Sequence, residues 1–244
     1  MPMKRSERTC EVPEATIQRL PLYLEKLKLL QGIGVEDVSS RQLAESLSIK
    51  ASQLRHDFHY FGGFSRPGRP YRVAKLVGAL EQIIGVDHAV PTAIVGAGHL
   101  GQALANYPGL QLQGFPIRGI FDVNPKLQGL EIRGQPIRDL DELEPVCRRE
   151  GIKIGVITVP SSHAQDVATR LVDAGVMGLL NFAPTELKVP DHVSVRHERL
   201  TVGIMALSFK VKCGEQDREE QAAAMAAAAA PETGAAAEGD SRGD

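Results

Sequence analysis

A short glycine-rich stretch has the residue types of a nucleotide-binding loop. The apolar run "TAIV" and the helical pattern "HLGQALANY" flank a G-x-G-x-x-G motif made by Gly96, Ala97, Gly98, His99, Leu100 and Gly101. In this motif the first glycine allows a tight turn, the second lets the backbone approach a pyrophosphate, and the third lets helix and strand pack closely. Free N–H groups at the helix start favour phosphate. The stretch therefore predicts a dinucleotide site formed by these six residues.

An acidic residue follows at the spacing that ribose recognition requires. Asp122 lies 21 residues after Gly101, at the end of the next apolar run. A carboxylate there accepts hydrogen bonds from both ribose hydroxyls and repels a 2′-phosphate, which favours NADH and NAD⁺ over their 2′-phosphorylated forms. Two other interpretations stay open: a glycine-rich turn without a ligand, and a site for another nucleotide such as coenzyme A.

Two later strand ends add candidates for the nicotinamide side of the same site. Ligands of open parallel sheets bind along the carboxyl ends of the strands. The residues expected there are Thr158, Val159 and Pro160 in one turn, and Asn181, Phe182, Ala183 and Pro184 in the next. The alternative is that these are simple strand-ending turns.

Little in the chain suggests catalysis on a bound substrate. A dehydrogenase needs a proton donor near the hydride carbon, and His163 after "TVPSS" is the best candidate. The chain has no Tyr-x-x-x-Lys pair and leaves little length for a substrate domain. Its three cysteines lack metal-ligand spacing. We therefore expect no catalytic residues and no metal site.

A basic module precedes the glycine-rich loop. Ser52, Gln53, Arg55, His56 and His59 fall on the polar face of a predicted helix. Gln bonds adenine bidentately and Arg bonds guanine, whereas Ser and His more often contact phosphate. Arg66 and Arg69 follow beside prolines, and such arginines suit a narrow A·T-rich minor groove. The stretch predicts DNA binding; a solvated charged face is the alternative.

The elements that position this module are helical. Apolar residues recur at helical spacing in "PEATIQRLPLYLEKLKLL", where Pro21 is expected to kink or interrupt the helix. Ser40 is the expected cap of a second helix. A third helix, "ASQLRHDFHYF", buries Leu54 and Phe58 and ends at Gly62 and Gly63. With the following "GGFSRPGRPYRV" they predict a winged helix-turn-helix domain over residues 11–85.

From about residue 90 the pattern changes to alternating apolar strands and helices. This alternation predicts an α/β domain, a Rossmann-like dinucleotide-binding fold with a parallel sheet, over residues 90–200. A last helix over residues 201–213 is apolar on more than one face, so a partner subunit is expected to surround it. Residues 214–244 are acidic and alanine-rich and are expected to form a disordered tail, with some helix in the alanine run.

Charge and composition narrow the partners. Residues 1–80 carry 13 Lys and Arg against 8 Asp and Glu, whereas residues 214–244 carry 2 against 8, and the whole chain of 244 residues has a net charge of −2. A basic first third suggests a polyanion partner for that part. The chain has no apolar run of about 18 residues, which argues against a membrane span. Scattered cysteines fit the cytoplasm.

Several motifs occur together in an order that resembles one family. They are "VPEATIQRL", "SQLRHDFHYFG", "IVGAGHLGQALANYPG", "FDVNP", "TVP" and "NFAP". Over roughly residues 11–212 the chain resembles the Rex redox-sensing transcriptional repressors. The resemblance implies a homodimer of N-terminal winged helices and C-terminal Rossmann domains, with a last helix that is swapped between subunits. It also implies that operator DNA is bound when NADH is low and released when NADH binds.

The chain departs from the family pattern at a few positions. His56 stands where the family usually has lysine. Glu25 stands where the family tends to have an arginine, and Arg199 where it has an aspartate. In the family these two groups, with the tyrosine that corresponds to Tyr107, are thought to link the DNA and nucleotide domains. Since a reversed pair attracts with the same Coulomb energy, we expect a charge-swapped Glu25–Arg199 switch.

The sequence thus predicts a redox-sensing repressor whose partners are double-stranded operator DNA, NADH or NAD⁺, and a second copy of itself. A two-fold dimer requires an inverted repeat, and the arginines of the predicted wing favour A·T-rich flanks. The alternatives are an NAD-dependent oxidoreductase with an unusual N-terminal extension and a coenzyme A-binding regulatory module. Turnover of a small substrate would indicate the first, and nucleotide competition would indicate the second.

Overall fold

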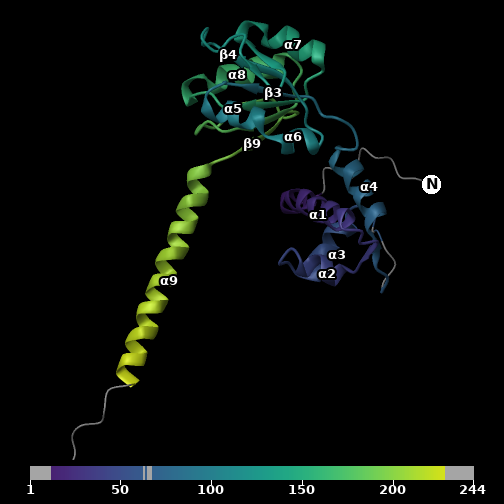
Figure 1. Cartoon of the computed structure of the whole chain (residues 1–244), viewed down its shortest axis with the longest axis vertical. Coiled ribbons are helices and arrows are strands. Elements are labelled where there is room, and N and C mark those ends of the chain that lie inside the picture. Colours follow the sequence, from purple (N-terminus) through teal and green to yellow (C-terminus); the bar gives the residue numbers. More distant parts are fainter. Residues whose placement is uncertain (1–11, 63, 65–67, 229–244) are drawn as a thin grey trace, which may run out of the picture.

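A computed structural model describes residues 12–62, 64 and 68–228 of the chain. Figure 1 shows a small helical domain, an α/β domain and a long C-terminal helix that projects away from the sheet. The helical domain and the α/β domain each have a hydrophobic core of their own.

The N-terminal domain is a winged helix-turn-helix. Its elements are α1 (Glu14–Gly32), β1 (Asp37–Val38), α2 (Ser40–Glu45), α3 (Ala51–His59), β2 (Tyr71–Arg72) and α4 (Val73–Ile84). The α2–α3 pair forms the helix-turn-helix, and β1 pairs antiparallel with β2 at the base of the wing. Leu54 and Phe58 of α3 are buried as predicted, and they pack in one core with apolar side chains of α1, α2 and α4.

Three details of this domain differ from the sequence-based expectation. Helix α1 runs through Pro21 without a break. The cap of α2 is Ser39 rather than Ser40, because the Ser39 hydroxyl accepts from the Gln42 N–H while the Gln42 side chain accepts from the Ser39 N–H, a reciprocal capping box. Helix α4 adds a fourth helix, whose buried leucines and valines close the core against α1.

The α/β domain is a seven-stranded sheet in the order β5-β6-β4-β3-β7-β8-β9. The strands are β3 (Thr92–Val95), β4 (Ile117–Asp122), β5 (Glu131–Ile132), β6 (Gln135–Asp139), β7 (Ile154–Ile157), β8 (Gly178–Asn181) and β9 (Ser194–His197). All neighbours are parallel except β5, which forms a hairpin with β6. From β6 to β9 this is the strand order of a Rossmann fold, with the order reversing between β3 and β7.

Helices cover both faces of the sheet, which is why β3 is buried along its whole length. Ala93 and Val95 face the core made with α7 (Leu143–Glu150) and α8 (Ser161–Asp173), next to the 3₁₀ turn η2 (Leu140–Glu142). Ile94 faces the opposite core, with α5 (His99–Asn106). The short helix α6 (Pro108–Leu112) follows α5. The sheet therefore brings the ends of β3, β4 and β7 to one edge.

The C-terminal helix is longer than expected. Helix α9 spans Leu200–Ala228, so residues 214–228, expected in a disordered tail, continue the helix past the predicted end at residue 213. Glutamate, glutamine, arginine and alanine are strong helix formers, and they propagate the helix beyond Gly214. Residues 229–244 lie outside the described part. Across the described residues, no helix is long and apolar enough to cross a membrane.

Candidate functional site

A cleft opens at the sheet edge where the strand order reverses. It has a volume of about 540 Å³ and lies along the carboxyl ends of β3, β4 and β7. Its lining comprises Val95, Gly96, Gly98, Asp122, Val123, Leu140, Thr158, Val159, Pro160, His163, Asp166, Val167 and Arg170. The cleft thus contains six of the predicted cofactor residues, namely Gly96, Gly98, Asp122, Thr158, Val159 and Pro160.

The glycine-rich loop has a shape that only glycine allows at its two ends. Gly96 has φ +101°, and a Cβ there would lie 2.8 Å from the carbonyl carbon of Thr158. A Cβ on Gly101 would lie 1.9 Å from the carbonyl oxygen of Gly96. Around Gly98, by contrast, no described atom lies within 4 Å of an added Cβ. The loop is therefore closed on the protein side and open on the cleft side, which fits the close approach of a pyrophosphate.

Side chains hold this loop in place. The Thr158 hydroxyl donates to the carbonyl oxygen of Gly96 over 2.7 Å, which joins the turns after β3 and β7. Gly98 is the N-cap of α5 and provides no side-chain cap, so the first N–H groups of the helix have no capping oxygen from that residue. Among the predicted loop residues, Ala97, His99, Leu100 and Gly101 belong to the loop and helix start but do not line the cleft.

Asp122 lies at the cleft edge with its carboxylate held by the backbone. One oxygen accepts from the Ala97 N–H over 2.6 Å and the other from the Asn124 N–H over 2.7 Å. Each oxygen keeps a further lone pair, because a carboxylate oxygen accepts about two hydrogen bonds. The carboxylate is thus oriented by the glycine-rich loop itself and retains acceptors for ribose hydroxyls.

The cleft also includes residues that the sequence analysis did not place in the site. Asp166, Val167 and Arg170 lie on the same face of α8 as His163, one and two helical turns further along the helix. Arg170 is anchored by the Glu144 carboxylate at 3.0 Å and by the carbonyl oxygen of Leu140 at 2.9 Å. The available signal was their i, i+3, i+4, i+7 spacing from His163, directly after a strand-ending turn.

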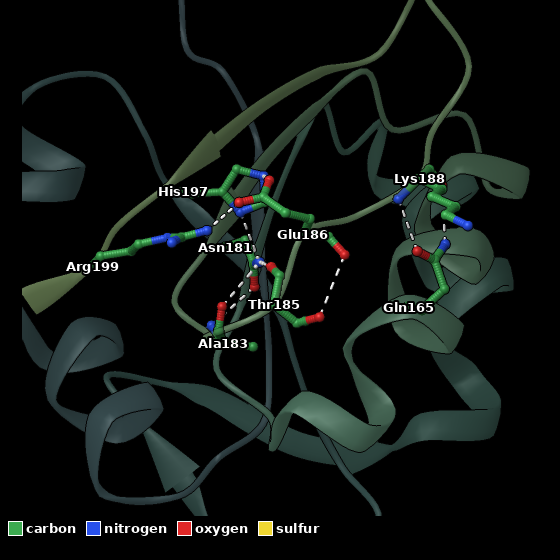
Figure 2. Close-up of polar contacts among 8 residues, drawn as sticks. All are labelled: Gln165, Asn181, Ala183, Thr185, Glu186, Lys188, His197 and Arg199. Atoms are coloured by element: carbon green, nitrogen blue, oxygen red, sulfur yellow. Dashed lines mark hydrogen bonds and ion pairs between the residues drawn. The ribbon is translucent and has the colours of Figure 1, made fainter.

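The turn after β8 lies outside the lining of the cleft, and Figure 2 shows the polar contacts that hold it. Asn181 is fully buried, and its side-chain oxygen accepts from the Ala183 N–H over 2.9 Å. Its amide nitrogen donates to the carbonyl oxygens of Ala183 and Thr185. The predicted residues Asn181, Phe182, Ala183 and Pro184 therefore form a turn that is held together by the Asn181 side chain.

The same amide group determines the tautomer of a neighbouring histidine. Because the Ala183 N–H is a donor, the Asn181 oxygen must face it, and the Asn181 nitrogen then lies 3.1 Å from His197 Nδ1, so that its two N–H groups are shared among this ring nitrogen and the two carbonyl oxygens. A proton on Nδ1 would oppose this amide donor. A neutral His197 therefore carries its proton on Nε2, which lies 3.1 Å from the Glu186 carboxylate. Glu186 also pairs with Arg199, directly before α9. Figure 2 shows this chain of contacts from Asn181 to Arg199.

The expected Glu25–Arg199 pair is absent from the described residues of this single chain. Arg199 pairs with Glu186, while Glu25 is exposed on α1 and makes no ion pair with any described residue. Tyr107, between α5 and α6, has 61% of its surface exposed. The structure thus gives Arg199 a nearby partner that the sequence analysis missed, and it leaves Glu25 and Tyr107 available at the surface.

The predicted DNA-contacting residues of α3 form an exposed face. Ser52, Gln53, Arg55, His56 and His59 are all exposed. Two of them also bond within the domain: Arg55 donates to the Ser40 hydroxyl over 3.2 Å and Gln53 donates to Asp57 over 2.9 Å. Arg69 is exposed next to β2, and Arg66 lies outside the described residues. Arg72 and Lys75, which the sequence analysis did not include, line a hollow with Arg69.

A metal site has no support in the described residues, and Cys147 is no candidate for thiol chemistry. Between residues 12 and 228, apart from the undescribed wing positions, no group of His, Cys, Asp or Glu is arranged to hold a metal ion. Cys147 is buried, and this burial raises the pKa of its thiol to about 11, so it is an unreactive core residue.

Comparisons with known proteins agree with this two-part architecture. A family described as CoA binding domain matches residues 87–185, and one described as putative DNA-binding protein N-terminus matches residues 11–58. The redox-sensing transcriptional repressor Rex of Roseiflexus sp. (strain RS-1) is 44% identical over 191 residues, which cover 78% of this chain and 87% of that protein.

Two solved structures of a Rex-family repressor, RSP, match almost over their full length. RSP in complex with β-NAD⁺ and operator DNA has a TM-score of 0.79 and 40% identity, covering 86% of this chain and 97% of RSP. RSP in complex with β-NADH has a TM-score of 0.77 and 38% identity, covering 86% and 98%. The predicted fold class and the absence of an enzymatic role are confirmed by these relatives, which are repressors. The chain belongs to the Rex family of redox-sensing transcriptional repressors.

Proposed function

We propose that this chain represses transcription by binding operator DNA when NADH is low and leaves the DNA when NADH binds. The main supporting observation is that one chain carries both an exposed recognition helix, α3, and an open glycine-lined cleft at the Rossmann switch point. RSP, whose structure matches 86% of this chain, was crystallised with β-NAD⁺ and operator DNA. A transcription regulator of this kind acts in the cytoplasm.

The cleft residues fit a dinucleotide. The open backbone at Gly98 and the start of α5 would hold the pyrophosphate, and Asp122 would accept from the ribose hydroxyls and exclude a 2′-phosphate. The bound cofactor supplies a nicotinamide ring that is charged when oxidised and neutral when reduced. We further propose that the turn of Phe182, Ala183 and Pro184, which lies outside the cleft lining in this single chain, forms an apolar wall beside the nicotinamide ring. Such a wall disfavours the charged ring.

The DNA side requires two copies of the chain. Exposed apolar side chains of α9, among them Ile204, Leu207 and Phe209, would be buried against a second copy that contributes its own α9. A two-fold dimer presents two α3 helices, so the operator is an inverted repeat whose half-sites are about one helical turn, or a multiple, apart. Arg66 and Arg69 of the wing would read A·T-rich flanks.

The two sites must be linked through a conformational equilibrium. The arrangement that cannot bind DNA must hold NADH more tightly than the DNA-binding arrangement, since a ligand held equally by both shifts no population. We place the link at Glu25, Tyr107 and Arg199, with Arg199 exchanging its partner Glu186 for Glu25 between the two states. The exposed positions of Glu25 and Tyr107 support this exchange.

A titration of operator-bound protein tests the proposal. The DNA is the protein's own upstream region, and release is followed by mobility shift with NADH, NAD⁺ and NADPH added separately. NADH is expected to release the DNA at much lower concentration than NAD⁺, and NADPH, which Asp122 repels, is the matched control. Equal release by NADH and NAD⁺ would reject redox sensing, and sequence-blind binding would reject the repressor role.

A coenzyme A-binding regulator is the second candidate, favoured by the match of residues 87–185 to the CoA binding domain family. Its adenosine and pyrophosphate would occupy the same loop. Competition between coenzyme A and NADH for the isolated full-length protein separates the two, because a coenzyme A regulator binds coenzyme A more tightly than NADH.

A further inference from the structure

A buried carboxylate joins α1 to the recognition helix. Asp57 of α3 is completely buried, and both of its oxygens are saturated by side chains. One oxygen accepts from Arg19 Nε and the Tyr23 hydroxyl at 2.7 and 2.6 Å. The other accepts from Arg19 Nη2 at 2.7 Å and the Thr16 hydroxyl at 3.1 Å. Three residues on one face of α1 thus converge on a single residue of α3.

The fifth hydrogen bond to this carboxylate comes from the DNA-facing surface. Gln53, one turn before Asp57 on α3, donates from Nε2 to Asp57 Oδ1 over 2.9 Å. Gln53 itself is exposed. Its side chain therefore has one edge anchored on a buried anion and the other edge facing outward, where no described residue bonds to its carbonyl oxygen.

The anion removes the usual ambiguity of a glutamine amide. An ionised carboxylate is an acceptor only, so Nε2 must face Asp57. A rotated amide would press the Gln53 oxygen against the Asp57 oxygen, two acceptors in contact with no proton between them. The outward edge of Gln53 is consequently one carbonyl oxygen and one remaining N–H.

We infer that Asp57 is a positioning residue for base recognition, which holds the Gln53 amide in the one orientation that selects adenine in the major groove. This inference rests on the proposed operator binding and deepens it. Adenine presents N7 as an acceptor beside the N6 amino donor, which matches the outward N–H and oxygen of Gln53. Guanine presents two acceptors, N7 and O6, so its O6 opposes the Gln53 oxygen.

Arg19 and Tyr23 of α1 also contribute to the orientation of Gln53, through their hydrogen bonds to Asp57. Their bonds hold Asp57 still, so the rotation of α3 about its own axis and the direction of Gln53 are fixed by α1. A mobile carboxylate would leave the amide free to rotate, and a freely rotating amide accepts either purine. The cluster therefore converts a tolerant polar side chain into one that distinguishes adenine from guanine.

The experiment measures base preference instead of affinity alone. Full-length protein selects from a duplex library with about two helical turns of randomised base pairs, and the bound fraction is sequenced for wild type, Gln53→Met, Asp57→Asn and the double variant. Wild type is expected to prefer A·T over G·C by about tenfold or more at one position of each half-site. Both single variants should lose that preference at that position and keep it elsewhere.

The double variant separates positioning from general weakening. If Asp57 acts through Gln53, adding Asp57→Asn to Gln53→Met changes the A·T preference no further. Thr16→Val is the matched control, because it removes a different donor from the same Asp57 oxygen and should leave the base preference intact. An unchanged adenine preference in Gln53→Met or Asp57→Asn, with all duplexes weakened equally, would overturn the inference.

A second variant tests the role of Asp57 if Asp57→Asn does not fold. Removing one partner of a buried ion pair is more disruptive than neutralising both, so Arg19→Gln with Asp57→Asn replaces a single variant that fails to fold. It is expected to bind the library without the adenine preference, and retained preference in this variant contradicts the inference. If wild type selects no inverted repeat at all, the proposed repressor function fails rather than the role of Asp57.

Discussion

At the scale of single residues, space and hydrogen-bond partners explain the cleft. Gly96 and Gly101 face protein backbone, whereas Gly98 faces the open cleft. Asp122 is oriented by the N–H of Ala97, a residue of the loop that it serves. The three glycines of one motif therefore have different physical requirements, which substitutions can separate.

Gly101→Ala and Gly98→Ala form a matched pair. A Cβ added at Gly101 would clash with the Gly96 carbonyl oxygen, so the loop must shift in Gly101→Ala, and the free energy of unfolding is expected to fall by about 1–3 kcal/mol. The methyl group at position 98 meets no described atom and should leave stability unchanged. Calorimetry of both variants, with NADH binding followed by fluorescence, checks this. Both should bind NADH at least about tenfold more weakly, and equal destabilisation by the two would contradict the assignment.

Arg199 offers a second test at this scale. Arg199→Glu repels Glu186 and is expected to impair the release of DNA by NADH, and Glu25→Arg should restore it if the two residues pair in one of the two states. The measurement is the NADH concentration that releases half of the operator from each of the four proteins in a double-mutant cycle. Glu186→Gln measures the effect of the Glu186–Arg199 ion pair separately. Independent effects of the substitutions at positions 25 and 199 would rule out their coupling.

At the scale of elements, buried polar contacts decide how α1 and α3 pack. Burial alone would raise the pKa of Asp57, but hydrogen bonds from Arg19, Tyr23, Gln53 and Thr16 outweigh it and lower the pKa from 3.8 to about 2. Burial and the Asp57 hydrogen bond in turn raise the pKa of Tyr23. The ionised carboxylate is thus the state that holds the two helices together.

Acid should loosen this pair of helices in a defined range. Because the pKa is lower in the folded protein, the stabilisation is present above about pH 4 and is lost as the pH falls towards 2, about 2 kcal/mol in all. Tyr23→Phe removes one hydrogen bond to the carboxylate, so it should raise the pKa of Asp57. The stabilisation should then be lost at a higher pH than in the wild type. Carbon NMR of the Asp57 carboxyl group measures both. Tyr71→Phe, in the same core, is the control and should not move this pKa.

At the scale of the whole molecule, α9 is the helix whose apolar side chains a single chain leaves uncovered. Its apolar side chains from Leu200 to Val211 are largely exposed, and the helix projects away from the sheet domain (Figure 1). Apolar surface of this extent on a projecting helix is typical of an interaction face. Among the described side chains of the charged and alanine-rich second half, from Gly214, Met225 is the one large apolar residue that is exposed.

Two truncations test this division. Removing residues 200–244 should give a monomer whose operator affinity is about 100-fold lower or worse, because the two recognition helices are no longer linked. Removing only residues 214–244 should leave the dimer and its operator affinity intact. Sedimentation velocity and mobility shift measure the two properties. A dimer that survives the longer deletion would place the interface elsewhere.

The sequence by itself determined the elements and the kind of site. The G-x-G-x-x-G motif, the acidic residue 21 positions later and the alternation of apolar strands with helices are local patterns that together predict a Rossmann-like nucleotide-binding domain. The same holds for the inward positions of Leu54 and Phe58. Two boundaries predicted from the sequence were wrong, at Ser39 and at the end of α9. Both signals were local: Ser39 and Gln42 have the spacing of a capping box, and the alanine, glutamate and glutamine residues after Gly214 favour helix.

Only the tertiary structure decided which distant residues act together. The face of α8 in the cleft, the partner of Arg199 and the convergence of Arg19, Tyr23 and Gln53 on Asp57 join residues from different elements. A side chain's hydrogen-bond partner depends on which surfaces are pressed together when the core closes, and no short-range pattern records this. The residue types of the glycine-rich loop can therefore be recognised from a short stretch of sequence. The orientation of Gln53 towards a base and of Asp122 towards a ribose depends on tertiary packing.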